Sequence, residues 1–459
     1  MSTRGSSSSI ILAKEGRSSV FSRQSKSADA PLSDGDSAKD DFASHPAGGH
    51  ATGSSLGTFV NILCLAMGVG TLQLPYTVRQ SGWFGTAFIP LAAMVAFLNS
   101  VVTVRCMYLK PGGGRIGNYH EIGFEAFGKL GYYAISAFNI VNIIGSIGIY
   151  VILASSNTSD LLAQVGVHVS PRILMIASTA VMCIPTLFAK TLAETFLVSL
   201  IGTITSAIVT VAVVAMACAF PIRNGDMRVG SSTTHVGAIA HHAVLPGGFS
   251  MALSSVTFAY IGSTIVPHLE AGMRRPQKFT AVFGLALAVI AAIYVVIAAT
   301  GYWAYGDRTL SPVTQNFPRL WPTTLANISM TIHVLFAGPL YLVQMALEIE
   351  DGLAIARKGP RAERLWRLAV RVGCALVILA IAEAIPFFND VISLVGALTN
   401  PVLIYLAPIA CYLKLRGWGN CSWPLLAGLA TLLVFGMVVS GFGLVQTVVD
   451  IVATFRGRR

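Results

Sequence analysis

The sequence has few charged residues for its length. Of 459 residues only 11% are charged and 54% are hydrophobic, whereas a soluble domain carries about 25% charged residues. Apolar runs of 18 residues or more recur from about residue 55 to the C-terminus, and each is long enough to cross about 30 Å of hydrocarbon. The chain is therefore predicted to be an all-α, multi-pass membrane protein.

Residue sets that mark an enzyme or a cofactor site are missing from the sequence. It has no hydrolase triad, no phosphate-binding loop and no metal ligands at metal-binding spacing, so we expect neither an enzyme nor a bound cofactor. Six of the seven cysteines lie in or beside apolar runs, where they act as small apolar side chains. The net charge of +11 does not indicate nucleic acid binding, because the basic residues lie in short loops that orient a membrane protein.

The first 52 residues differ from the rest of the chain. They are rich in Ser, Gly and Asp and hold no apolar run long enough to pack or to act as a secretory signal. We expect residues 1–52 to form a disordered cytoplasmic tail. Residues 53–455 then form the transmembrane domain.

Eleven apolar spans are predicted in this domain. They cover about 54–79, 83–109, 131–164, 171–189, 194–222, 246–272, 279–303, 324–356, 365–386, 389–415 and 422–447. Lys and Arg are more frequent in the loops on one side, which places the N-terminus in the cytoplasm. The sequon at Asn157 falls on the opposite side and is a glycosylation candidate.

Two of the spans carry helix breakers at mid-depth. Span 1 reads "GTLQLP" from Gly70 to Pro75, and span 6 reads "GSTIVP" from Gly262 to Pro267. The offset of five spans is expected for two inverted repeats, about 54–222 and 246–415, followed by an extra helix at about 422–447. Matching interruptions in two halves indicate a binding site at mid-membrane. The alternative is that the glycines let neighbouring helices pack closely.

The polarity of the two breaks suggests the ligand. A helix that restarts near Gly70 presents N–H groups that suit a carboxylate, and a helix that ends near Tyr260 presents carbonyls that suit an ammonium group. A zwitterionic amino acid carries both groups. The candidate substrate-binding residues are Gly68, Val69, Gly70 and Thr71 in span 1, Phe258, Ala259, Tyr260, Gly262 and Ser263 in span 6, and Asn142 and Ser146, which share a polar face of span 3 with Asn139.

Four residues are candidates for coupling to an ion. Glu270 follows the second break and either carries a proton or pairs with Arg274. His268 lies beside it and titrates near neutral pH as a free side chain. His333 and Thr331 lie inside span 8, where each has either a coupling role or a structural hydrogen bond.

Several segments resemble the amino acid/auxin permease family, with most likeness to its vesicular inhibitory and plant vacuolar amino acid transporter branch. They are "GVGTLQLPYTVRQSGWFG", "VTFAYIGSTIVPHLEAGMRRPQKF", "GYWAYGD", "SLVGALTNPVLIYLAPIACYLKL" and "SGFGLVQTVVDIV". The resemblance implies the leucine-transporter-type fold, an inverted 5+5 repeat with helices 1 and 6 broken. It also implies secondary transport of amino acids, usually coupled to protons.

One position differs from the residue that members of this family carry. Sodium-coupled members, and the vesicular branch, carry an Asn where this chain has Cys64. A thiol is a poor ligand for a hard cation such as Na⁺. This difference favours protons as the coupling ion over sodium, although sodium bound by backbone oxygens stays open.

The leading hypothesis is a secondary active transporter that moves small neutral amino acids by alternating access with proton coupling. An auxin-like or aromatic amino acid carrier of the same family is the alternative, and an uncoupled channel or receptor is the alternative from another class. We expect a monomer in a vacuolar or vesicular membrane or in the plasma membrane. The sequence leaves open the particular amino acid, and whether transport is symport or antiport.

Overall fold

The computed structural model describes most of the chain after residue 52. The described residues are 53–110, 112–188, 195–222, 226–229, 232–235, 237–260, 263–353, 355, 359–384 and 388–456. The predicted tail and Gly262 lie outside them.

The described part is helical apart from one short hairpin in a loop. The elements of its first half are α2 (Ser55–Ala66), η1 (Val69–Gln73), α3 (Leu74–Ser81), η2 (Trp83–Ala87), α4 (Phe88–Met107), α5 (Tyr119–Gln164), α6 (Pro171–Phe188) and α7 (Thr195–Ala219). The hairpin, β1 (Asp226–Val229) antiparallel to β2 (Ser232–His235), was not predicted from the sequence.

The second half begins after this hairpin. Its elements are η3 (Pro246–Gly248), α8 (Phe249–Ala259), η4 (Ser263–Ile265), α9 (Val266–Ala271), η5 (Pro276–Lys278), α10 (Phe279–Tyr305), η6 (Gly306–Arg308), η7 (Val313–Asn316), α11 (Trp321–Gly352), α12 (Pro360–Ala384), α13 (Phe388–Asn400), the π-helical η9 (Pro401–Leu406), α14 (Ala407–Arg416), η10 (Trp418–Asn420) and α15 (Trp423–Arg456).

The helices match the predicted spans to within a few residues in most places. Among the described residues, eight helices are long and apolar enough to cross a membrane, and α2 with η1–α3 makes a ninth if that bent pair is one span. The apolar α6 is shorter, and α8 and α9 flank residues 261–262, which are not described. The protein is a multi-pass membrane protein, while the count of eleven spans and the inverted repeat stay predictions.

The third predicted span differs most from the observed helix. α5 begins at Tyr119 rather than near residue 131, and Gly128, at φ 65° and ψ −149°, kinks it. The Glu121 carboxylate accepts hydrogen bonds from the backbone N–H groups of Gly117 (2.9 Å) and Asn118 (3.2 Å). This capping box starts the helix before its apolar run begins. The first turns of α5 are therefore not visible in the pattern of apolar residues.

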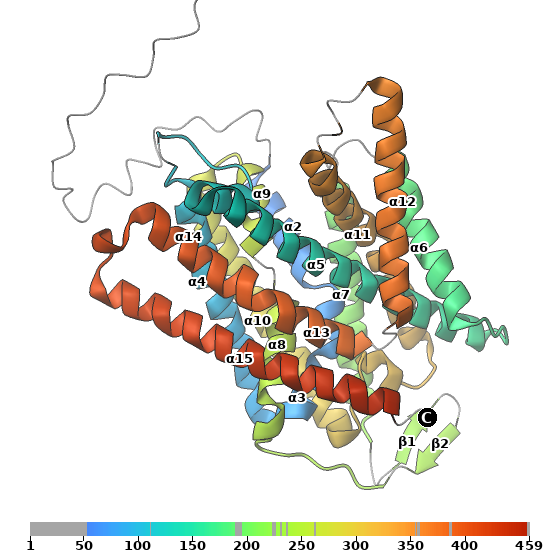
Figure 1. Ribbon diagram of the computed structural model, residues 1–459. Coiled ribbons are helices and arrows are strands. Elements are labelled where there is room, and N and C mark those ends of the chain that lie inside the picture. The colour runs from blue at the N-terminus through green and yellow to red at the C-terminus, as the bar shows by residue number, and fades with distance from the viewer. Residues whose placement is uncertain are drawn as a thin grey trace, which may run out of the picture. The chain divides into compact units, whose positions relative to one another are not determined.

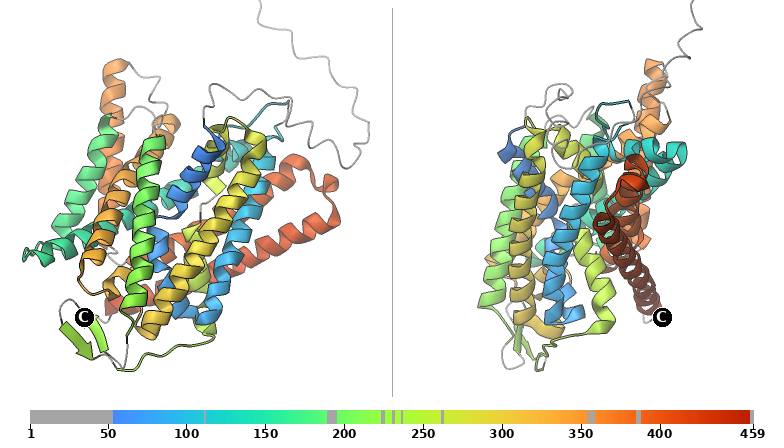
Figure 2. Two further views of the ribbon diagram at one scale, coloured as in Figure 1. Left: turned by 180° about the vertical axis from the view of Figure 1, so that it is seen from behind. Right: turned by 90° about the vertical axis from the view of Figure 1, so that its left-hand side faces the viewer.

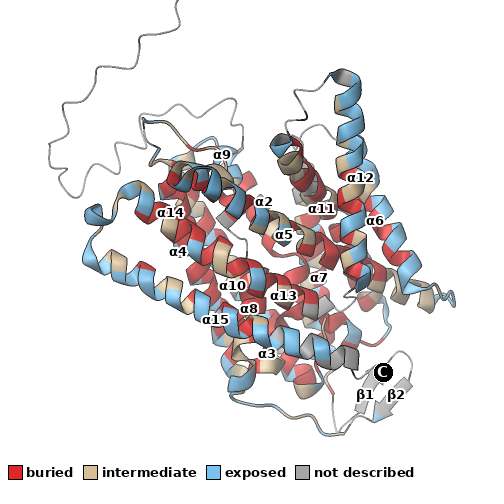
Figure 3. Ribbon diagram, in the orientation of Figure 1, coloured by how far each residue is buried: buried red, intermediate tan, exposed pale blue. Residues whose placement is uncertain are grey.

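The short broken helices lie among long ones. α3 packs against α10 and α8, α2 packs against α7 and α10, and α5 packs against α11, α12 and α13. Figure 1 shows α15 running along α13 and α8, and Figure 2 shows α10 standing between α7 and α4. Buried residues gather around α2, α5 and α13 (Figure 3).

The outermost helices expose apolar side chains. On α15 these include Val434, Phe442 and Val445, which are 62–66% exposed, and on α12 they include Leu365 and Leu376, at 67% and 60%. Figure 3 shows exposed residues along both helices. Exposed apolar faces of this kind fit a lipid environment, since lipid does not penalise them as water does.

Candidate functional site

The first helix break lies where the glycines predict it. α2 ends at Ala66, and Gly68 has φ −90° and ψ −138° before η1 begins at Val69. The two halves are bent by 43°. Thr71 holds this geometry, because its backbone N–H (3.2 Å) and its Oγ1 (2.7 Å) both donate to the carbonyl of Gly68. The N–H groups of Val69 and Gly70 open the new helix and have no carbonyl within it to donate to.

The second break begins at Tyr260. α8 ends at Ala259, and Tyr260 is extended, with φ −93° and ψ 151°. The Tyr260 hydroxyl donates to the carbonyl of Ile89 on α4 at 2.9 Å. Tyr260 is therefore fixed to a neighbouring helix by its hydroxyl. The chain is described again from η4, which leads into α9.

The two breaks touch each other. A Cβ placed on Gly70 would lie 2.8 Å from the Cβ of Ala259. Gln73 Nε2 donates to the carbonyl of Ser255 in α8 at 2.9 Å. The Tyr294 hydroxyl on α10 lies within hydrogen-bonding distance of two carbonyls, that of Ala66 at the first break and that of Ala259 (2.9 Å) at the second. The close packing expected of this glycine is therefore present at Gly70, and that packing joins the two breaks.

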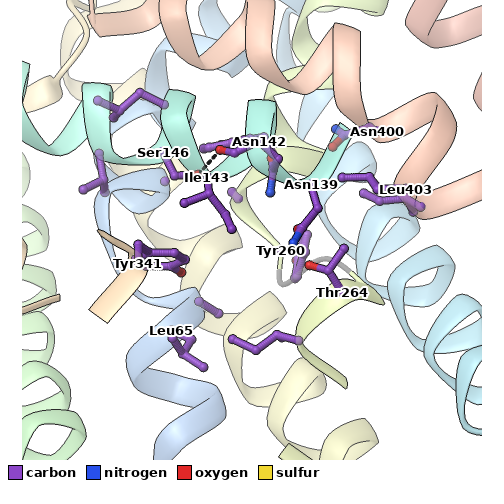
Figure 4. Close-up of a pocket in the computed structure, with 18 of the residues that line it drawn as sticks. Leu65, Asn139, Asn142, Ile143, Ser146, Tyr260, Thr264, Tyr341, Asn400 and Leu403 are labelled. Carbon is purple, nitrogen blue, oxygen red and sulfur yellow. Dashed lines mark hydrogen bonds between the residues drawn. The ribbon is translucent and has the colours of Figure 1, made fainter. Parts of the chain in front are cut away.

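A cavity of about 100 Å³ lies beside this junction. α5 crosses above it with Asn139 and Asn142 directed into it (Figure 4). Its lining residues come from the first break (Leu65, Ala66, Val69, Gly70), α5 (Asn139, Asn142, Ile143, Ser146, Ile149, Tyr150), the second break (Phe258, Ala259, Tyr260, Thr264, Ile265), α11 (Tyr341, Gln344) and α13–η9 (Asn400, Leu403, Ile404). Seven of the predicted substrate-binding residues are among them.

The polar face of α5 forms one wall of the cavity. Ser146 Oγ donates to the carbonyl of Asn142 at 2.8 Å, and the Asn142 side-chain oxygen accepts from Thr399 Oγ1 at 3.2 Å. Asn139 Nδ2 donates to the carboxylate of Glu348 at 3.0 Å, and Asn139 Oδ1 has no partner in the described structure. The residues expected to share a polar face of the third span therefore line the cavity together.

Other predicted binding residues lie next to the cavity rather than in its lining. Gly68 lies against His333, because a Cβ on Gly68 would be 3.1 Å from His333 Nε2. Thr71 supports the backbone of the break, as described above. Ser263 begins η4, and Gly262 is outside the described residues.

Several cavity residues were not predicted as binding residues from the sequence. Tyr341 and Gln344 project from one face of α11, and Thr264 follows the second break. Asn400 Nδ2 donates to Thr257 Oγ1 at 2.8 Å, and the π-helical η9 follows Asn400 where Pro401 indicates an interruption. Neither Tyr341 nor Gln344 lies in a motif that marks a binding site, so only the packing of the helices shows that they share a cavity with the breaks.

The coupling candidates occupy different places. His333 is 1% exposed, and its Nδ1 lies 3.2 Å from the carbonyl of Gly202 and 3.3 Å from Ser206 Oγ. Because a carbonyl only accepts, Nδ1 carries the proton and Nε2 faces the first break. Thr331 Oγ1 donates to the carbonyl of Asn327 in its own helix at 2.7 Å. His268 is exposed on α9.

Glu270 is held by a different arginine from the one expected. It is 1% exposed, and its Oε2 accepts from Arg115 Nε at 2.8 Å, while Tyr108 donates to its Oε1. Arg115 Nη2 also donates to the carbonyl of Pro267 at 2.7 Å. The suggested pairing with Arg274 is thus replaced by a clamp from the α4–α5 loop. This clamp ties the end of the second broken span to that loop.

Replacing Glu270 with glutamine is expected to destabilise the protein by about 2 kcal/mol. Losing one partner of a buried ion pair costs about 3–5 kcal/mol, and this cost is reduced because the Arg115 side chain is 24% exposed. The measurement is the melting temperature of the purified protein in detergent. Glu125→Gln is the control, since its partner Lys110 is 40% exposed and such pairs contribute little. Equal shifts in the two variants would contradict the clamp.

The sequon at Asn157 is not presented at the surface. Asn157 is 2% exposed inside α5. A glycan needs an accessible asparagine. The folded chain therefore does not offer this residue for glycosylation.

Comparisons with known proteins identify the family and the fold of this chain. The family model "Transmembrane amino acid transporter protein" matches residues 51–449. The chain belongs to this family. Because it is a family of transport proteins, this membership confirms the prediction that the protein is not an enzyme.

The transporter is similar to curated members of the family from Arabidopsis thaliana. It is 27% identical to amino acid transporter AVT1I over 388 residues, covering 83% of this chain and 90% of the relative. It is 26% identical to amino acid transporter AVT1D over 389 residues, covering 83% of this chain and 66% of the relative. The chain thus spans about two thirds of the length of the longer relative.

A solved structure shows the fold of the transporter. A Na⁺-coupled sialic acid symporter superposes with a TM-score of 0.53 at 11% sequence identity, covering 88% of this chain and 92% of the symporter. This likeness confirms the leucine-transporter-type fold that the family resemblance implies, while the inverted repeat and the number of spans stay predictions. At 11% sequence identity, the superposition is evidence for the fold only.

Proposed function

We propose that the transporter moves small neutral amino acids by alternating access, coupled to protons, and works as a monomer. The observation that carries the proposal is the cavity beside the two touching helix breaks. Val69 and Gly70 of the first break and Phe258, Ala259 and Tyr260 of the second all line it. The N–H groups of the first break and the carbonyls of the second suit the carboxylate and the ammonium group of one amino acid. Family membership and the names of the relatives support the same substrate class.

The size and polarity of the cavity favour a small, uncharged side chain. Its volume of about 100 Å³ is below the roughly 300–1,000 Å³ of pockets for drug-sized ligands. Each of the lining residues described above is neutral. A charged substrate side chain would meet no opposite charge there, and burying it would be costly.

Sequence features support the proposed coupling ion and orientation. Cys64 is buried in α2, and its thiol suits sodium poorly. With the N-terminus in the cytoplasm, the α4–α5 loop and the Glu270 clamp face the cytoplasm. We place the transporter in an endomembrane or in the plasma membrane.

The test is counterflow in proteoliposomes preloaded with unlabelled alanine. A carrier accumulates labelled alanine transiently without an ion gradient, whereas a channel or a receptor does not. Competition by glycine, serine, glutamate, lysine, tryptophan and indole-3-acetic acid then defines the substrate. Best competition by tryptophan or indole-3-acetic acid would favour the aromatic or auxin-like alternative. If neither alanine nor any of these compounds, each preloaded in turn, supports counterflow, the proposal is refuted.

Proton coupling is tested in the same vesicles. An imposed pH gradient is expected to change the initial rate of alanine uptake, and a sodium gradient at constant pH is expected to leave it unchanged. The opposite pattern would show sodium coupling.

A further inference from the structure

Three buried carboxylates in the described structure have different kinds of partner. Glu270 is bonded to Arg115. Glu350, 3% exposed, pairs with Arg371 at 3.0 Å and with Arg367 at 3.6 Å. Arginine stays charged at every physiological pH, so each of these two carboxylates keeps a positively charged partner.

Glu348 has a different environment. Its side chain is 7% exposed, and its ion-pair partner among the described residues is His120, with Nδ1 3.7 Å from Oε1. Oε2 accepts the amide of Asn139 at 3.0 Å, and Oε1 has no hydrogen-bond partner. A buried carboxylate whose charged partner is a histidine loses its compensation when that histidine loses its proton.

The pair is also connected to the substrate cavity. Asn139 lines the cavity and donates to Glu348, and Gln344, one helical turn before Glu348 on α11, lines the cavity too. While the Asn139 amide nitrogen is held by Glu348, its unpartnered Oδ1 is available to accept from a ligand. Figure 4 shows Asn139 on the wall that faces Tyr260 and Thr264. That is the side of the cavity where the proposed function puts the ammonium group.

Other titratable groups lead from the pair toward the α4–α5 loop. The ring of Tyr132 meets that of His120 edge-on at 4.9 Å. The exposed His268 on α9 interacts electrostatically with His120, and also with Arg115 and Glu121. On the other side, Glu350 and its two arginines are engaged with each other. His120, at the start of α5, is therefore the residue through which these groups meet Glu348.

We propose that Glu348 and His120 form the proton-binding site of the transporter and that Asn139 connects this site to the bound amino acid. This inference rests on the proposed function and adds the residues that would couple it to protons. With the proton present, the pair is neutral overall, as carboxylate with imidazolium or as carboxylic acid with imidazole. When the proton leaves His120 for water, a buried carboxylate remains, bonded only to the Asn139 amide.

The sign of the coupling follows from electrostatics. An ammonium group bound near Asn139 stabilises the negative, deprotonated pair and opposes the protonated one. Binding of a neutral amino acid therefore releases a proton, and by linkage proton binding weakens the affinity for the amino acid by the same factor. The expected factor is about tenfold, within the usual range of such couplings.

The first experiment measures protons on substrate binding. Alanine is added to the purified full-length protein in weakly buffered detergent solution containing a pH indicator. The native protein is expected to release protons, whereas Glu348→Gln, which keeps the size and a carbonyl oxygen for Asn139, is expected to release none. Glu363→Gln is the matched control, because Glu363 is 32% exposed and pairs with Arg367 on the outer part of α12. Proton uptake by the native protein, or release by Glu348→Gln equal to native, would overturn the inference.

The second experiment separates coupling from transport and from folding. In proteoliposomes, Glu348→Gln is expected to lose the acceleration of uptake by a pH gradient while still performing counterflow, which needs no net proton movement. His120→Gln is expected to flatten the pH profile of counterflow in the same way. Counterflow in the variant also shows that it is folded. If a pH gradient accelerates uptake by the native protein and by Glu348→Gln to the same extent, the proton site lies elsewhere. If native protein shows no counterflow, the proposed function itself fails.

Discussion

Gly70→Leu is expected to abolish alanine counterflow while leaving membrane insertion intact. The first added atom would already lie 2.8 Å from the Cβ and 2.9 Å from the Cα of Ala259, distances at which the two breaks must separate. The remaining leucine atoms would enter a cavity of only about 100 Å³. Gly70→Ala, with the same first clash but no further atoms, is expected to keep a small residual rate.

Gly441→Leu is the control for this pair. Gly441 lies on the exposed face of α15, and a Cβ there meets no atom within 4 Å. This variant should transport at the native rate. All three proteins are compared for yield and size-exclusion profile before assay. Native counterflow by Gly70→Leu would show that Gly70 is no part of the binding site.

Tyr294→Phe is expected to lower the initial rate of uptake at least about tenfold, equivalent to about 1.4 kcal/mol. Tyr294 is fully buried, and its hydroxyl is within reach of the carbonyls of Ala66 and Ala259. Those carbonyls end the first half of each broken span, so they have no partner within their own helices. Leaving a buried acceptor without a donor costs about 1–3 kcal/mol. We therefore expect the two breaks to lose their fixed relative position.

A matched control for this substitution exists on the same helix. Tyr305 is 1% exposed, and its hydroxyl donates to the carbonyl of Phe220 at 3.1 Å. Tyr305→Phe removes an equivalent hydrogen bond away from the breaks. It should lower the melting temperature in detergent by a similar amount and leave the uptake rate close to native. If both variants transport equally, the Tyr294 hydroxyl has no special role at the junction.

The helix breaks are a case where the sequence predicts structure closely: the restart expected near Gly70 lies at Val69, and the helix end expected near Tyr260 lies at Ala259. The end of α2 at Ala66, the break at Gly68 and the end of α8 at Ala259 follow from glycine and proline, whose effects on the backbone are local. The polar face of α5 is equally local, because helical periodicity places Asn139, Asn142 and Ser146 on one side. Residue types and their spacing are sufficient for such features.

The sequence does not predict the partners of Glu270 or the pairing of Glu348 with His120. Local spacing suggested Arg274 for Glu270, but the structure brings Arg115 from 155 positions earlier. Sequence reasoning overlooked Glu348 and His120, since neither has a distinctive neighbour along the chain. A carboxylate near the end of a long helix looks like an ordinary interfacial residue until its surroundings are known.

The sequence by itself determined that this protein spans a membrane many times, where two of its helices break, and which chemical groups those breaks expose. The tertiary structure decided that the breaks touch through Gly70 and Ala259, that Tyr294 bonds across them, and which side chains of α5, α11 and η9 enclose the cavity. The physical reason is range. Backbone conformation and helical faces depend on residues within a few positions, whereas the contacts at this site join residues up to 257 positions apart, and only the packing of the helices brings them together.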